Sequence, residues 1–187
     1  RLDAAARSMP RARIAPFHRT AMATLSSFDV TTGVDLQEVD NALNQAHKEV
    51  AQRYDFKGSI ASIEFKRAES LIVLIAESNM RMAALLDILQ SKLIKRGVPV
   101  KNLDIGEAKP AGGDTLRREI KLKMALDMET AKKVAATIKA AKLKKVQAAI
   151  QGDQVRVSAP SKDDLQEAMQ LLRATDFGVE LRFGNYR

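Results

Sequence analysis

Residues 146–161, VQAAIQGDQVRVSAPS, carry the clearest signal for the fold. Two alternating segments, 146–151 and 154–158, flank a Gly-Asp pair that is typical of a two-residue β-hairpin turn. Ser161 is a suitable N-cap for a helix, and apolar residues recur at helical spacing after it. This stretch therefore predicts two paired strands followed by a helix.

The segments on either side complete a βαββαβ unit. Residues 115–123 alternate between apolar and polar as a strand does, and Asp127 is placed to cap a helix that includes Ile138. A short closing strand is expected at 179–183. This order is that of a ferredoxin-like module, in which two helices cover one face of a four-stranded antiparallel sheet.

The same order of elements occurs in the first half of the chain. Asp35 is placed to cap one helix, and Gly97 is placed to end a second one. The sequence therefore predicts an α/β (α+β) protein built from two ferredoxin-like modules. The strands expected in the first module are 28–32, 60–66, 71–76 and 100–105.

One strand of the first module differs from the others in its pattern. Residues 71–75, LIVLI, are apolar on both faces of the predicted strand. The sheet around this strand is therefore expected to be covered on both sides. The cover could come from the second module, from another copy of the chain or from a partner protein.

Composition divides the chain into four parts. Residues 1–26 are Arg-rich at their start and are predicted to be a disordered leader. The first module is expected at 27–107, a linker at 108–114 (AKPAGGD) and the second module at 115–187. The pattern leaves open whether the strand at 28–32 pairs within its own module or crosses to the other sheet.

The positive charge of the chain is concentrated in its second half. The net charge is +8, and residues 108–187 hold sixteen Lys and Arg against ten Asp and Glu. This excess favours an anionic partner for the second module, although a solvated, lysine-rich helix surface would also account for it. The sequence has no Cys, which suits a reducing cytoplasm, and no apolar run approaches the roughly 20 residues that span a bilayer.

The sheet face away from the helices is expected to hold the binding site of the second module. The first and third strands are central in this topology, so Lys121, Lys123 and Arg156 are expected near the middle of that face. Cations and amides suit phosphates and base edges, whereas an ordinary solvated sheet face is the alternative explanation. The nucleotide-binding residues predicted for this face are Lys121, Lys123, Gln151, Gln154, Arg156 and Arg182.

A second candidate site is the RYDFKG motif at residues 53–58. Arg53, Phe56 and Lys57 could cradle a base and a phosphate at the turn from helix to strand. A helix C-terminus that ends at Gly58 explains the same motif equally well.

Several of these segments together resemble the YajQ family. They are SFDV at 27–30, VDLQEVDNA at 34–42, RYDFKG at 53–58, LLDILQSKLIKRG at 85–97, REIKLK at 118–123 and IQGDQVRV at 150–157. The resemblance covers residues 27–187 and implies a bacterial, cytoplasmic nucleotide-binding protein with paired ferredoxin-like domains. It further implies either binding of a cyclic dinucleotide with action through a transcription regulator, or an interaction with RNA.

The sequence favours binding over catalysis. It contains no P-loop, no G-x-G-x-x-G, no G-x-S-x-G and no His or Cys set with metal-ligand spacing. We therefore expect no enzyme activity, no cofactor and no metal. The leading interpretation is a nucleotide-binding regulator, most specifically one that binds cyclic di-GMP and acts through a protein. The alternative is an RNA- or tRNA-binding protein, which the missing aromatic residues on the central strands disfavour.

Overall fold

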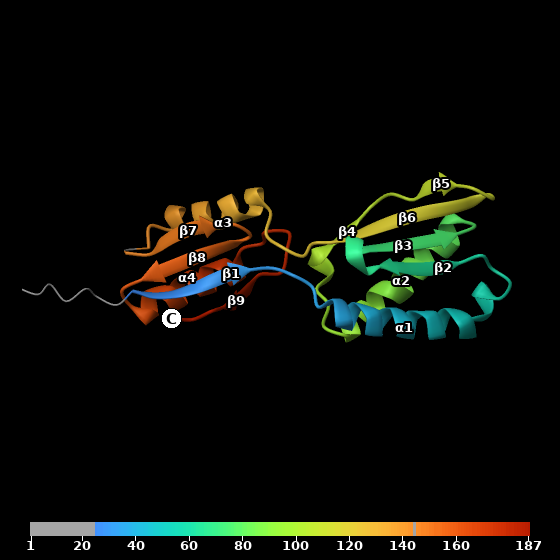
Figure 1. Cartoon of the computed structure of the whole chain (residues 1–187), viewed down its shortest axis with the longest axis horizontal. Coiled ribbons are helices and arrows are strands. Elements are labelled where there is room, and N and C mark those ends of the chain that lie inside the picture. The colour runs from blue at the N-terminus through green and yellow to red at the C-terminus, as the bar shows by residue number, and fades with distance from the viewer. Residues whose placement is uncertain (1–24, 144) are drawn as a thin grey trace, which may run out of the picture.

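Two antiparallel sheets, each carrying two helices, form two lobes that lie end to end along the longest axis of the molecule (Figure 1). The computed structural model describes residues 25–143 and 145–187. The prediction of two ferredoxin-like modules is confirmed. No helix in the described part of the chain has both the length and the apolar character that a membrane crossing requires. Residues 1–24 of the predicted leader lie outside the described residues, whereas Ser26, which we assigned to the leader, begins the first strand.

The α1–α2 lobe contains a sheet in the order β2-β3-β6-β4, with β5 paired to β6. Its first helix begins where the sequence predicts, since the Asp35 carboxylate accepts a hydrogen bond from the Gln37 N–H at 2.8 Å. Leu43 is buried and Asn44 is exposed, so this helix turns one apolar face to the core. The elements are α1 (Leu36–Gln52), β2 (Ser62–Lys66), β3 (Leu71–Ala76), α2 (Asn79–Lys95), β4 (Leu103–Ile105), β5 (Lys109–Ala111) and β6 (Thr115–Leu122), with short 3-10 turns at Tyr54–Phe56, Arg67–Glu69 and Val100–Asn102.

The α3–α4 lobe contains a sheet in the order β7-β8-β1-β9. Asp127 and Ser161 cap its two helices as predicted. The Gly152 turn joins β7 to β8, and this glycine has a φ of 64°. The elements are β1 (Ser26–Thr31), α3 (Met128–Ala140), β7 (Gln147–Gln151), β8 (Gln154–Ala159), α4 (Lys162–Ala174) and β9 (Arg182–Gly184).

The two lobes exchange their first strands. β1 lies between β8 and β9 in the α3–α4 lobe, and β6 lies between β3 and β4 in the α1–α2 lobe. The prediction that residues 115–123 form a strand of the second module is therefore wrong, and the open question about the strand at 28–32 is answered by a crossing. The alternating pattern did not reveal the exchange, because a strand at the centre of either sheet has the same alternation of apolar and polar residues. Each central strand needs one apolar face against a pair of helices.

The predicted linker at 108–114 is largely a β-hairpin. Residues Lys109–Ala111 form β5 and pair with β6 through the register Lys109↔Arg117 and Ala111↔Thr115. Gly113 and Asp114 both have positive φ angles, which lets the chain reverse tightly at this point. The Gly- and Pro-rich composition that indicated a linker is thus explained by a turn beside an edge strand, where proline is tolerated.

The apolar strand β3 is buried on both faces, as its LIVLI sequence predicts. Ile72 and Leu74 belong to the core beneath α1 and α2, whereas Val73 points to the opposite face and is also 0% exposed. Val73 lies between Glu64 on β2 and Glu119 on β6. The cover over Val73 therefore comes from this chain, and Ile75 on the same face stays partly exposed.

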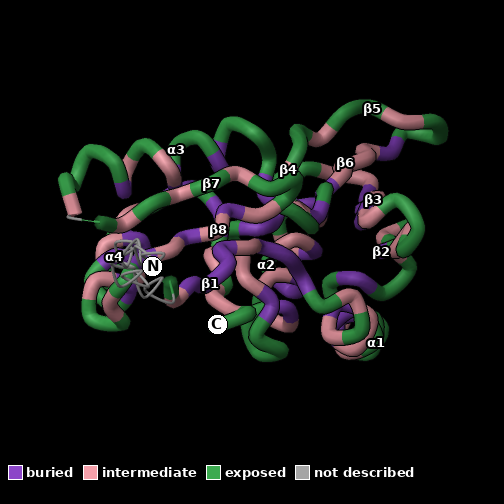
Figure 2. Tube along the Cα trace, turned by 60° about the vertical axis from the view of Figure 1, so that its left-hand side comes forward, coloured by how far each residue is buried: buried purple, intermediate pink, exposed green. Residues whose placement is uncertain are grey.

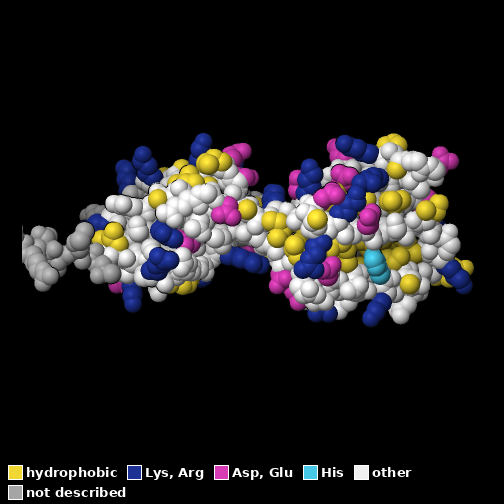
Figure 3. Space-filling view, in the orientation of Figure 1, with side chains coloured by type: hydrophobic (Ala, Val, Ile, Leu, Met, Phe, Trp, Pro, Cys, Tyr) yellow, Lys and Arg dark blue, Asp and Glu magenta, His cyan; other side chains and the backbone are white. Residues whose placement is uncertain are grey.

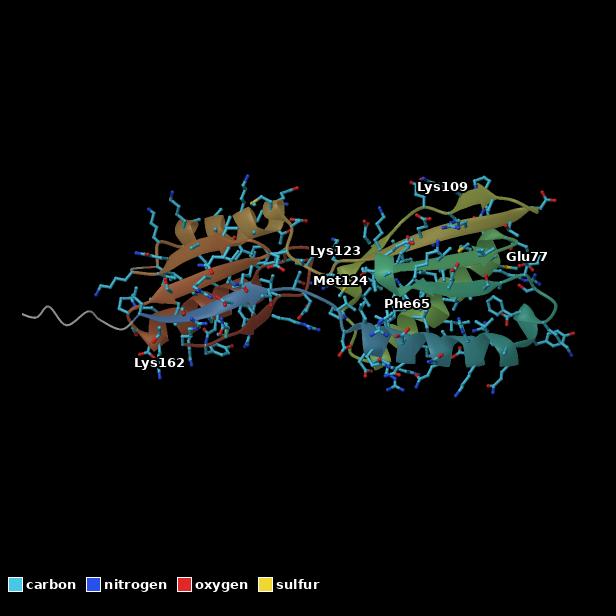
Figure 4. The ribbon with its side chains drawn as sticks, viewed as in Figure 1. Phe65, Glu77, Lys109, Lys123, Met124 and Lys162 are labelled. Atoms are coloured by element: carbon cyan, nitrogen blue, oxygen red, sulfur yellow. The ribbon has the colours of Figure 1, made fainter. Side chains whose placement is uncertain are left out.

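One asparagine joins the segments that cross between the lobes. The Asn102 side chain is 0% exposed, and its Nδ2 donates to Thr32 Oγ1 at 3.0 Å and to the Gly33 and Lys123 carbonyls at 3.3 Å each. Its Oδ1 accepts from the Glu180 N–H at 2.8 Å. Asn102 therefore ties both crossing segments to the chain that leads into β9. Figure 4 labels Lys123 and Met124 in the narrow region between the lobes.

Candidate functional site

The strand exchange separates the predicted site residues. Lys121 lies on β6 in the α1–α2 lobe, so it does not share a sheet with Arg156 on β8. Lys123 lies in the second crossing segment, where its Nζ is 3.4 Å from the Gly178 carbonyl oxygen. The predicted grouping of Lys121, Lys123 and Arg156 on one face is therefore wrong. Gln151, Gln154 and Arg156 do share the α3–α4 sheet, Arg182 lies at its β9 edge, and Arg53, Phe56 and Lys57 lie at the end of α1.

Arg156 is engaged by a buried carboxylate that sequence reasoning missed. Its Nε and Nη2 donate to the two oxygens of Asp29 at 2.8 and 2.9 Å. Asn185 also donates to this carboxylate, which is only 3% exposed. The Arg156 guanidinium first, and the Asn185 amide to a smaller degree, hold the pKa of Asp29 below its ordinary value of 3.8. The charge of Arg156 is therefore neutralised within the fold, and little of it is available to a phosphate.

The RYDFKG motif has the local structure of a helix end. Arg53 makes two hydrogen bonds to Asp55, at 3.0 and 2.8 Å, and its guanidinium carbon lies 5.8 Å from the centre of the Phe56 ring. Phe56 is buried in the core of the α1–α2 lobe, so its ring is not open for stacking on a base. Gly58 follows with a φ of 74°. Of the three residues predicted here, Lys57 alone is both exposed and without an ion pair to another described residue.

A hollow lies where β9 and the end of α4 meet the other lobe. We call it the junction hollow. Its volume is about 780 Å³, within the roughly 300–1,000 Å³ typical of small-molecule sites. The residues that line it are Lys101, Leu172, Arg173, Thr175, Val179, Glu180, Leu181, Arg182 and Phe183.

The lining of the junction hollow is mainly polar and carries an excess of positive charge, with a smaller apolar contribution from Leu181 and Phe183. Three basic residues line it, against the single carboxylate of Glu180. The Arg173 guanidinium lies over the Phe183 ring at 5.2 Å, and neither Arg173 nor Arg182 makes an ion pair with another described residue. Exposed guanidinium groups of this kind bind phosphate through paired hydrogen bonds. The hollow therefore suits an anionic ligand.

Lys101 connects the hollow to a neighbouring carboxylate. Its Nζ lies 3.2 Å from Asp176, which also accepts a hydrogen bond from the Gly178 N–H at 3.0 Å. The Gly178 N–H, followed by the Lys101 ammonium, holds the pKa of Asp176 below its ordinary range. This pair is exposed on both sides, so the attraction is screened and Lys101 can turn to a bound phosphate at little cost.

The hollow beside Lys121 has a different charge balance. It measures about 460 Å³ and is lined by three basic and three acidic side chains. Within it, Arg117 is paired to Glu119 at 2.8 Å. Figure 3 shows basic and acidic side chains intermingled over this lobe. This hollow therefore attracts anions less than the junction hollow does.

Comparison with known proteins identifies the family. The sequence matches the family described as "Nucleotide-binding protein YajQ-like" over residues 26–187. The chain belongs to this YajQ-like family. A relative from Desulfitobacterium hafniense, named "Nucleotide-binding protein", is 46% identical over 166 residues, which are 89% of this chain and 100% of the relative. Relatives with the same name from Geotalea uraniireducens and Carboxydothermus hydrogenoformans are each 48% identical, over 87% and 89% of this chain and 99% and 100% of theirs. The resemblance inferred from the motifs is confirmed.

Two residues of the junction hollow in this YajQ-like protein were missed by sequence reasoning. Lys101 belongs to the first half of the chain, and Arg173 lies in the last turn of α4, where a basic residue is ordinarily explained by the helix dipole. They meet because the chain between α4 and β9 lies beside the crossing segments, where Glu180 bonds to Asn102 and Thr32. No local motif signals that approach, although Arg182 was predicted and does line the hollow.

The Asp29–Arg156 pair predicts a pH-dependent contribution to stability in the YajQ-like protein. Asp29→Asn should lower the free energy of unfolding at pH 7, because Arg156 would lose its anionic partner. The folded-state pKa of Asp29 is depressed, so the stabilisation is present above about pH 4 and is lost as the pH falls through the folded-state pKa. Urea unfolding at several pH values should show the difference from the unmodified protein shrinking below about pH 4. A difference that stays constant down to pH 3 would contradict an ionic origin. Asp87→Asn, at an exposed position on α2, serves as the control.

Proposed function

We propose that this YajQ-like protein binds a nucleotide in the junction hollow without transforming it. The specific ligand we favour is a cyclic dinucleotide such as cyclic di-GMP, and the effect passes to a protein partner such as a transcription regulator. The observation that carries the proposal is the gathering of Lys101, Arg173 and Arg182 around one hollow. The name shared by relatives that are 45–48% identical supports the nucleotide class.

The chemistry of the hollow supports binding without catalysis. Glu180 is the one titratable acid among its lining residues, and the lining holds no histidine to exchange protons near neutral pH. The guanidinium groups of Arg173 and Arg182 stay charged at all physiological pH values. Such a site neutralises phosphate and retains it. The cysteine-free sequence is compatible with the reducing cytoplasm in which such a regulator would act.

RNA is the competing ligand, and the exposed lysines of the α3–α4 lobe are the observation that favours it. Lys132, Lys139, Lys142 and Lys145 are all exposed. A polymer that neutralises several phosphates binds with a log K that falls by about 0.7 to 0.9 per phosphate for each decade of salt. A dinucleotide carries only two phosphates, so its salt dependence should be much shallower.

Thermal unfolding of the full chain against a panel of ligands tests the proposal. The panel contains GMP, cyclic di-GMP and a single-stranded RNA 12-mer, each at low and high salt. A ligand at 100 times its Kd adds about 2.7 kcal/mol. For a chain of this size, that raises Tm by about 5 to 11 °C. We expect cyclic di-GMP to produce such a shift with little salt dependence. No shift with either nucleotide would contradict the proposal, and a steeply salt-dependent shift with RNA alone would favour the competing function.

A further inference from the structure

Each lobe has a groove between its first helix and the strand at the edge of its sheet. The groove between α1 and β2 has a volume of about 520 Å³, and the groove between α3 and β7 has a volume of about 440 Å³. The two grooves are equivalent, because both lobes have the ferredoxin-like order and each edge strand precedes the inner strand with which it forms a hairpin. A comparison of the two therefore shows what is particular to each.

The α1–β2 groove is bridged by a side chain. His47 on α1 places its Nε2 2.9 Å from the carbonyl oxygen of Ile63 on β2. This bond occupies a backbone acceptor at the edge of the sheet. β2 also carries Glu64 and Lys66, and charged residues on an edge strand discourage pairing with another chain.

The α3–β7 groove lacks such a bridge. Lys139 lies on α3 at the same distance from its capping aspartate as His47 lies on α1. Within residues 25–143 and 145–187, no side chain is hydrogen-bonded to the backbone of β7. The sequence of β7 is QAAIQ, which contains neither charge nor proline. Figure 2 shows β7 as an outer strand beside α3, with buried β8 and β1 inside it.

The edge of β7 therefore offers unpaired backbone groups next to an apolar floor. Antiparallel pairing with β8 uses the N–H and C=O groups of alternate residues only, so the remaining residues turn these groups outward. The floor of the groove is formed by Ala135, Ile138, Val146 and Ala148. These features match the requirements for a peptide that adds to the sheet as a further strand.

Lys139 lines this groove, and further lysines without a described acidic partner lie on α3 and in the segment that joins α3 to β7. Lys132, Lys139, Lys142 and Lys145 are exposed, and none makes an ion pair with another described residue. Figure 3 shows basic side chains projecting along the side of the lobe where α3 lies. Lys142 and Lys145 have φ angles of 51° and 68°, a conformation that favours glycine. Long cations thus occupy positions where glycine would relieve the backbone.

We propose that the α3–β7 groove binds an extended, acidic peptide segment of a protein partner, which pairs with β7 as an added strand. The backbone edge supplies hydrogen bonds, the apolar floor accepts alternate side chains, and the lysines attract the carboxylates. RNA is disfavoured as the occupant because the residues lining this groove include no aromatic side chain on which a base could stack. This proposal rests on the proposed function only in assuming that a protein partner exists. Its test uses no nucleotide, so peptide binding and nucleotide binding can each fail independently.

A fluorescein-labelled peptide, EVEVEVE, added to the full chain tests this inference by fluorescence anisotropy. We expect saturable binding, at least tenfold weaker binding of the same peptide with proline at its centre, and no binding of KVKVKVK. Hydrogen exchange should show new protection at the amides of β7 that do not pair with β8. Saturable binding without such protection, or equal binding of the proline peptide, would overturn the strand-addition mode.

Substitutions distinguish binding in the α3–β7 groove from a non-specific attraction of the peptide to positive charge. Lys139→Gln plus Lys142→Gln should weaken EVEVEVE at least tenfold, whereas Lys48→Gln plus Lys57→Gln near the bridged groove removes the same charge and should have little effect. Lys142→Gly plus Lys145→Gly should weaken the peptide while leaving Tm unchanged or raised, because glycine accepts the positive φ angles. Equal losses from both glutamine pairs, or binding of a poly-U 12-mer but not of the peptide, would overturn the proposal.

Discussion

A chain that begins at Thr115 should fail to fold, because the α3–α4 sheet would lose the strand at its centre. β1 pairs with β8 on one side and with β9 on the other. Phe28 and Val30 are both 0% exposed in the core of that lobe. Removing β1 would leave backbone groups of two neighbouring strands unpaired and open the core to water. Circular dichroism and one-dimensional NMR should therefore show no cooperative unfolding for residues 115–187.

A rearranged chain should restore the fold of that lobe. The two crossing segments touch, since a Cβ on Gly33 would lie 3.0 Å from the Met124 carbonyl oxygen. Joining residues 26–33 directly to residues 125–187 therefore needs little or no added linker. We expect this single-lobe protein to unfold cooperatively. Cooperative unfolding of residues 115–187 alone, with a similar Tm, would contradict the role of β1.

The elements of the fold could be predicted because their signals are local. Asp35, Asp127 and Ser161 each cap a helix through a nearby N–H, and Gly152 makes the predicted hairpin turn. The pairing of β1 and β6 could not be predicted in the same way. The alternation of apolar and polar residues predicts which face of a strand is apolar. It does not predict which strands lie on either side of it in the sheet. The pattern around Ile120 would fit the centre of either sheet.

The candidate site was harder to predict because its residues meet only through tertiary structure. The sequence predicts Arg156 as a cation available to a ligand, because its partner Asp29 lies 127 residues away and no local pattern reveals the pair. Lys101 and Arg173 belong to different lobes and approach one another through the junction that Asn102 holds. Both the Asp29–Arg156 ion pair and the junction hollow depend on strand order, because β1 lies in the α3–α4 sheet. The distribution of charge along the chain therefore favours an anionic ligand, but it does not predict where on the structure that ligand binds.

Loss of the two arginines in the junction hollow should weaken nucleotide binding by at least tenfold. A hydrogen bond to a charged group is worth about 1.5–3 kcal/mol, which is roughly tenfold or more in affinity for each contact. Arg173 and Arg182 are both exposed, so Arg173→Gln plus Arg182→Gln should change Tm little. The stability cost is confined to the contact of Arg173 with Phe183, for which about 0.5–1 kcal/mol is typical at an exposed site.

The lysines of α3 provide the matched control for this prediction. Lys139→Gln plus Lys142→Gln removes the same amount of charge from a different surface of the same lobe. Because the Debye length is about 8 Å at physiological salt, charges outside the hollow contribute little to the affinity of a small ligand. These lysines matter for the peptide groove but should not matter for a nucleotide.

Isothermal titration of cyclic di-GMP into the unmodified chain and both double variants at physiological salt tests the central claim most directly. The proposed site predicts one binding event in the unmodified chain, a Kd raised at least tenfold by Arg173→Gln plus Arg182→Gln, and a Kd unchanged by Lys139→Gln plus Lys142→Gln. An unchanged Kd in the arginine variant, with binding lost in the lysine variant, would contradict it and place the nucleotide at α3.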